Sequence, residues 1–170
     1  TRSSTHSPEC ADSSESLNER SDLMSGLESL YQELILDHSK KPHGRGLAEQ
    51  ADASGAAESH QHNPICGDDI TLRVRVDGED VRDVTWEGSG CSISQASASM
   101  LSDLAAGLSR EEAAHLISGF REALRSRGKI ELDIDEYGDA AALSGVSKFS
   151  ARVKCAMLAW VALEDALPRA

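Results

Sequence analysis

The chain has 170 residues and a formal net charge of −12, from 29 acidic and 17 basic side chains. This length supports one domain with a hydrophobic core. The sequence contains neither a basic cluster nor an aromatic platform, which argues against nucleic-acid binding. It has no run of about 18 apolar residues that could span a bilayer and does not open on a signal-peptide pattern. Four cysteines are too few for a disulfide framework, so we expect a reducing compartment and a cytoplasmic protein.

Residues 1–23 differ in composition from the rest of the chain. They are rich in Ser, Thr, Glu, Asp and Arg and contain almost no large apolar side chain, so we predict a disordered N-terminal extension. The domain is expected to span residues 24–170, and the run Met24-Ser25-Gly26 looks like a natural start. Cys10 lies in the extension, and we expect it to have no role in the functional site.

The first predicted element is an amphipathic helix between residues 27 and 42, with apolar residues at helical spacing and a proline that ends it. His38 and His43 near its end are expected to be surface or capping residues. Residues 44–61 have a weak pattern, and we expect an edge strand there to be short or poorly ordered. His60 and His62 are an alternative source of metal ligands.

Alternating apolar residues from 70 to 86, interrupted by Asp77-Gly78, predict a β-hairpin. Helical patterns follow at residues 93–106 and, after a capping box, at 109–124. Residues 126–148 are typical of a loop region with one helical turn at 139–143, and the last helix is predicted at 151–167. Together these elements predict an α+β domain, in which helices cover one small antiparallel sheet and a metal site lies at one end.

The motif Asn63-Pro64-Ile65-Cys66-Gly67-Asp68 is the first candidate metal-binding segment. Proline before the cysteine and glycine after it predict a tight, exposed turn. Cys66 and Asp68 have the same parity as the apolar residues of the next strand. If the extended geometry begins at the cysteine, the thiolate and the carboxylate point the same way and can supply two metal ligands.

Two further cysteines lie at ends of predicted elements. Cys91 follows Gly88-Ser89-Gly90 and precedes a helix, whose N-terminus favours the thiolate. Cys155 lies near the beginning of the last helix, where Arg152 and Lys154 could offset the negative charge of three thiolates and one carboxylate around Zn²⁺. No Cys-x-x-Cys pair is present, so this is not a zinc-ribbon signature. Unrelated buried thiols are the alternative, and the apolar neighbours of Cys155 also fit an ordinary core position.

The motifs together resemble the U-type iron–sulfur cluster assembly proteins, over about residues 27 to 167. Two features resemble the SufU branch more than the IscU branch. IscU-like proteins have a histidine directly before the third cysteine, where this chain has Lys154, and SufU-like proteins have a longer segment between the second and third cysteines, here 155 − 91 = 64 residues. The matching segments are Leu30-Tyr31, Ile35-Leu36-Asp37-His38, Pro42, Asn63-Pro64-x-Cys66-Gly67-Asp68, Gly88-x-Gly90-Cys91-x-Ile93-Ser94 and Ala151-Arg152-x-Lys154-Cys155-Ala156-x-Leu158-x-Trp160.

This resemblance implies an IscU/SufU-like fold and a zinc ion held by Cys66, Asp68, Cys91 and Cys155. It implies a zinc-dependent sulfurtransferase that accepts persulfide sulfur on Cys66 from a SufS-type cysteine desulfurase, which it stimulates. Cys66 would be released when a histidine of the desulfurase replaces it on the metal, and downstream SUF cluster-assembly proteins would use the sulfur. We expect Arg152 to support activity more than metal binding.

Two other functions stay open at this point. The same four ligands could hold an iron–sulfur cluster on an assembly scaffold, because thiolates bind both metals. A structural zinc module that docks a partner is a third possibility. Hydrolytic zinc catalysis is disfavoured, because four protein ligands leave no position for water.

Overall fold

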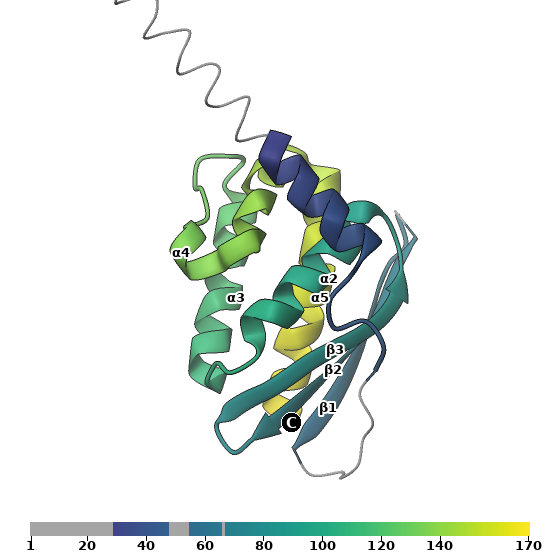
Figure 1. Cartoon of the computed structure of the whole chain (residues 1–170), viewed down its shortest axis with the longest axis vertical. Helices are drawn as coiled ribbons and strands as arrows, with labels where there is room; N and C mark the ends of the chain where they lie inside the picture. The colour runs from purple at the N-terminus through teal and green to yellow at the C-terminus, as the bar shows by residue number, and fades with distance from the viewer. Residues whose placement is uncertain (1–28, 48–54, 66) are drawn as a thin grey trace, which may run out of the picture.

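The computed structural model describes residues 29–47, 55–65 and 67–170 (Figure 1). Strands β1 (Ala56–Asn63), β2 (Asp68–Asp77) and β3 (Asp80–Ser89) form an antiparallel sheet in the order β1-β2-β3. Helices pack on it, which confirms the α+β prediction. The expected extension, residues 1–23, lies outside the described residues.

The β2–β3 hairpin forms as predicted, because its apolar residues alternate with polar ones. Ile70, Leu72 and Val74 are at most 3% exposed and face the helices, and Gly78 has a φ of +66° in the connecting turn. Asp68, the first residue of β2, has the same parity and is 1% exposed. The alternation of the strand therefore carries a carboxylate to the edge of the hydrophobic core.

Strand β1 corrects one expectation. It is eight residues long, and each residue is paired with β2, from Ala56 with Arg75 to Asn63 with Asp68. The strand lacks an apolar pattern because its inward face meets polar groups of the last helix, where Ser59 Oγ donates a hydrogen bond to Asp165 at 2.8 Å. Pairing with β2 stabilises this strand, and no local sequence signal reports such pairing.

The helical layer has two central members. Helix α5 (Ser150–Ala166) packs on β1 and β2, and helix α2 (Ser92–Ala105) packs on β3 and on α5. Helix α3 (Arg110–Arg125) begins with the predicted capping box and packs against α5, where Phe120 stacks on Trp160 with ring centroids 3.8 Å apart. The 3₁₀ turn η2 (Leu167–Arg169) ends the chain's last helix.

The segment expected to be mostly loop is largely helical. It contains α4 (Ile134–Tyr137) and the 3₁₀ segment η1 (Gly138–Lys148). Ala140, Ala141 and Leu143 are at most 1% exposed, so burial of small apolar side chains against the neighbouring helices orders a stretch that its glycines and aspartates marked as irregular.

The first described helix spans residues 29–40 and lies across the end of the helical layer (Figure 1). His38 in this helix is 4% exposed, so the expectation of a surface position is wrong. Its Nδ1 lies 2.6 Å from Ser99 Oγ of α2, and its Nε2 lies 2.8 Å from Asp139 Oδ2 of η1. His38 therefore joins three elements that are distant in sequence.

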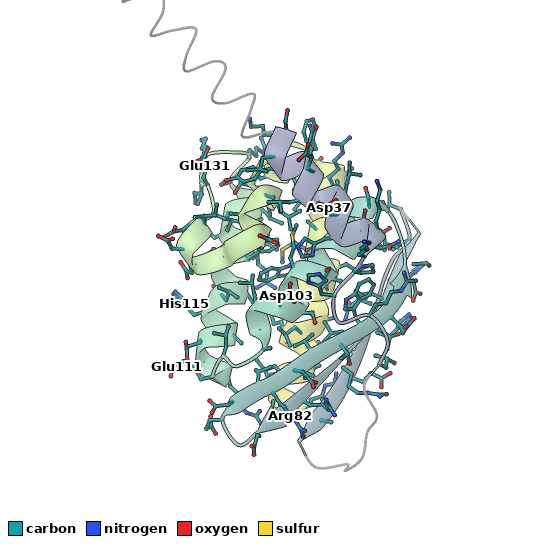
Figure 2. All side chains as sticks on the ribbon, viewed as in Figure 1. Asp37, Arg82, Asp103, Glu111, His115 and Glu131 are labelled. Carbon is teal, nitrogen blue, oxygen red and sulfur yellow. The ribbon has the colours of Figure 1, made fainter. Side chains whose placement is uncertain are left out.

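The negative charge is spread over the molecule. Asp37, Asp103, Glu111 and Glu131, labelled in Figure 2, come from four different segments. Among the described residues, no helix is both long enough and apolar enough to cross a membrane.

Candidate metal centre

Asp68 is the most informative side chain of the site. It is 1% exposed, and its Oδ1 accepts a hydrogen bond from the Cys91 backbone N–H at 3.0 Å. Its Oδ2 is buried and has no hydrogen-bond partner among the described residues. A buried carboxylate oxygen without a partner is costly, so this oxygen marks a position where a cation would be stabilised.

Cys91 is held beside Asp68 by the end of β3 and the beginning of α2. It is the N-cap residue of α2 and makes no side-chain capping bond. Gly90 permits the close approach, because a Cβ there would lie 2.5 Å from Asp68 Oδ1 and would also clash with the hydroxyl of Ser94. Ser94 Oγ donates a hydrogen bond to the Cys91 carbonyl at 3.0 Å, which ties this cysteine to the first turn of the helix.

Cys155 comes from the second turn of α5 and is 4% exposed. Ligand atoms of Asp68, Cys91 and Cys155 all lie within 4.8 Å of one another. Side chains from β2, the start of α2 and α5 thus converge, which the sequence predicted for these three residues. Cys66, the fourth predicted ligand, lies outside the described residues.

The donor set fits the metal that the resemblance implies. Two cysteine sulfurs and one carboxylate oxygen suit zinc or iron, whereas calcium and magnesium prefer oxygen ligands alone. The unpartnered Oδ2 of Asp68 supplies an oxygen for such an ion. Cys91 stands at the N-terminus of α2, where a helix carries a partial positive charge.

The two predicted cations are exposed rather than packed into the cluster. Arg152 lies over the ring of Phe149, with 4.8 Å between its Cζ and the ring centroid. It also lines a groove of about 550 Å³ together with Ser92, the neighbour of Cys91. The groove is walled by apolar residues of the first helix, α2 and η1, including Tyr31, Ile35, Ile93 and Val146, and by Phe149 at the N-cap of α5.

The alternative ligands His60 and His62 do not join the cluster. His60 Nε2 lies 2.9 Å from Asp69 Oδ1, and His62 Nδ1 lies 3.5 Å from Asp69 Oδ2. Asp69 follows Asp68 in a strand, and successive side chains of a strand point to opposite faces. Both histidines therefore lie on the sheet face away from Asp68.

A second group of possible ligands comprises His38, His43 and Asp103. His43 Nδ1 pairs with Asp103 Oδ2 at 2.5 Å, and the His43 N–H donates to Ser99 Oγ at 2.7 Å. Both ring nitrogens of His38 already have partners in α2 and η1. These bonds account for the cluster as a link between the first helix and its neighbours.

Comparison with known proteins identifies the family of this chain. A family model described as NifU-like N terminal domain matches residues 30–156. The iron–sulfur cluster assembly scaffold protein IscU of Streptococcus pyogenes serotype M1 is 42% identical over 146 residues, covering 86% of this chain and 87% of that protein. The zinc-dependent sulfurtransferase SufU of Bacillus subtilis (strain 168) is 41% identical over 143 residues, covering 84% and 92%.

Comparison with solved structures identifies the same family. The crystal structure of FiSufU from Fervidobacterium islandicum AW-1 is 34% identical, with a TM-score of 0.65, and the match covers 79% of this chain and 94% of that one. Relatives named as scaffold and as sulfurtransferase are almost equally similar, so the comparisons establish the family and leave the activity to the site. This chain belongs to the NifU-like N-terminal domain family, which includes the IscU and SufU proteins of iron–sulfur cluster assembly.

Proposed function

We propose that this protein is a zinc-dependent sulfur acceptor in iron–sulfur cluster assembly, which takes persulfide sulfur from a SufS-type cysteine desulfurase and stimulates that enzyme. The observation that carries the proposal is the buried, unpartnered Oδ2 of Asp68 beside Cys91 and Cys155. The 41% identity to the B. subtilis protein named as a zinc-dependent sulfurtransferase supports the choice of metal and reaction.

We assign Cys66, Asp68, Cys91 and Cys155 as the zinc ligands. Bound zinc would keep the thiols deprotonated at neutral pH. The chain contributes the geometry, because Asp68 uses one oxygen to hold the backbone of Cys91 and keeps the other for the ion. A carboxylate in the set makes the site less tightly closed than a four-cysteine structural site.

The proposed reaction is thiol–persulfide exchange on Cys66. The thiolate of Cys66 attacks the outer sulfur of the persulfide on the desulfurase cysteine and forms a new S–S bond. The original S–S bond breaks, and its electron pair leaves with the desulfurase cysteine as a thiolate. Oxidation levels balance without a further reactant, because one persulfide is exchanged for another.

We assign to Arg152 a supporting role in this exchange. It is an exposed cation in a protein of net charge −12, and it lines the apolar groove that Ser92, the neighbour of Cys91, also lines. A cation at this place attracts the anionic persulfide of an incoming partner. The groove offers that partner an apolar surface at the same end of the molecule.

An assembly scaffold is the second candidate, because the S. pyogenes relative of that name is 42% identical. The same donors could hold the iron–sulfur cluster as cargo. Lys154 favours the acceptor function, since its exposed side chain stands where IscU-like proteins have a histidine.

The deciding experiment measures sulfide release by a SufS-type desulfurase titrated with wild-type protein, Cys66→Ala and the control Cys10→Ala. We expect strong stimulation by wild type and Cys10→Ala, and none by Cys66→Ala. Mass spectrometry of the protein after reaction without reductant should detect one added sulfur atom only where Cys66 is present. Absence of stimulation by wild type, together with cluster formation in anaerobic reconstitution, would establish the scaffold instead.

A further inference from the structure

Asn63, the last residue of β1, carries a second buried polar atom without a partner. The residue is 6% exposed, and its Oδ1 accepts a hydrogen bond from the Ile65 N–H at 3.2 Å. This bond determines which end of the amide is oxygen, so Nδ2 must face away from the turn. Nδ2 is buried and has no hydrogen-bond partner among the described residues. A buried amide donor without a partner favours binding of an acceptor at this position.

The sheet register brings this donor to the metal centre. Asn63 pairs directly with Asp68, and directly opposite residues project from the same face of a sheet. The two buried unpartnered atoms, Nδ2 of Asn63 and Oδ2 of Asp68, are thus on neighbouring side chains. They are a donor and an acceptor, yet they are not hydrogen-bonded to each other. Both are therefore available to a shared occupant, the oxygen toward its cation and the N–H toward an anionic ligand.

We infer that Asn63 is a positioning residue of the metal centre, whose Nδ2–H donates an N–H···S hydrogen bond to a metal-bound thiolate. The inference rests on the proposed metal site. Three thiolates and one carboxylate around a divalent ion leave excess negative charge, and a donated hydrogen bond withdraws part of it from sulfur. Neither Arg152 nor Lys154 performs this task from inside, because both are exposed.

Two substitutions separate this role from the role of Asn63 in the turn. Asn63→Ser keeps an oxygen that can accept the Ile65 N–H and removes the amide donor. Asn63→Asp keeps the shape and the accepting oxygen but replaces the donor by an acceptor. Gln61→Ser is the matched control, because it also removes an amide from β1, two residues farther from the site, where Gln61 Nε2 donates to Ser59 Oγ at 3.0 Å.

The experiment uses the full chain loaded with Co²⁺ as a spectroscopic probe and, separately, zinc competition against a chromophoric chelator. In Asn63→Ser we expect the thiolate-to-cobalt charge-transfer bands to move to lower energy and zinc affinity to fall about 10- to 100-fold. Asn63→Asp should change both in the same direction, and Gln61→Ser should leave both unchanged. If circular dichroism shows that Asn63→Ser does not fold, Asn63→Asp decides.

If the folded Asn63 variants have the same thiolate-to-cobalt bands and the same zinc affinity as wild type, this inference is overturned and the metal site stays intact. Wild-type protein without thiolate-to-cobalt bands, or with bands whose energy and intensity are unchanged in Cys91→Ser, would overturn the metal site and the role of Asn63 together. Neither measurement involves the desulfurase, so a failure of the sulfur-acceptor function is detected separately.

Discussion

Asp68→Asn tests the central argument, because it replaces the proposed metal ligand with little change of shape. The amide orientation is determined by the neighbouring backbone: its oxygen must accept the Cys91 N–H, now 3.0 Å from Oδ1, since the NH₂ group cannot. The NH₂ group then occupies the position of the unpartnered Oδ2, where it cannot bind a cation. The variant also removes an unpaired buried charge. We therefore expect metal-free Asp68→Asn to be at least as stable as metal-free wild type.

The magnitude follows from linkage between binding and folding. Zinc at about 1,000 times its Kd stabilises the wild type by about 4.1 kcal/mol, and a site about 100-fold weaker would gain about 1.4 kcal/mol at the same concentration. In a chain of this size each kcal/mol shifts Tm by about 2–4 °C, so the zinc-induced rise should fall from about 8–16 °C to about 3–6 °C.

The assay is thermal unfolding with and without zinc, monitored by circular dichroism. Asp69→Asn is the control, because Asp69 is the sequence neighbour on the opposite sheet face, paired with His60. An equal zinc-induced shift in Asp68→Asn and wild type would refute the assignment of Asp68 as a ligand.

Three further predictions concern single side chains. Gly90→Ala should destabilise the protein by about 1–3 kcal/mol and weaken zinc binding, because its Cβ would lie 2.5 Å from Asp68 Oδ1. Denaturant titration measures the stability and chelator titration measures the zinc affinity. The control Gly145→Ala should change neither quantity, because no atom lies within 4 Å of its Cβ. Burial, together with two nearby glutamates, raises the pKa of Tyr137 to about 12, so folding favours the neutral phenol and this stability is complete below about pH 10 and lost between about pH 10 and 12. Tyr137→Phe should accordingly flatten the fall in denaturation midpoint over that window, and an unchanged slope would contradict this origin. Arg152→Ala should lower desulfurase stimulation while zinc content, measured by atomic absorption, stays at the wild-type level; loss of zinc would assign it to the metal site instead.

Several features were predictable because their causes are local. The hairpin follows from alternation around Asp77-Gly78, and the start of α3 follows from its capping box. The parity that links Asp68 to the apolar residues of β2 also predicted its inward direction. Such patterns depend on the period of a strand or on four neighbouring residues, so they can be identified without knowledge of the remaining chain.

Other features have no local signal. Strand β1 forms through pairing along its whole length with β2, and η1 is ordered by burial of its alanines between helices. His38 acquires its buried position from Ser99 and Asp139, which are 61 and 101 residues away. In each case the stabilising partner lies outside the segment itself, so composition alone suggested an irregular or exposed segment.

The difference between what the sequence determines and what the tertiary structure determines is clearest at the metal centre. The sequence by itself determined the residue types, the turn chemistry around position 66 and the strand and helix ends on which the cysteines lie. Only the tertiary structure decided that Asp68 divides its two oxygens between a backbone N–H and an open ligand position, and that Asn63 presents an unpartnered donor beside it. The reason is physical: hydrogen-bond saturation is a property of the folded interior, where water is excluded and each polar atom must find a partner in space.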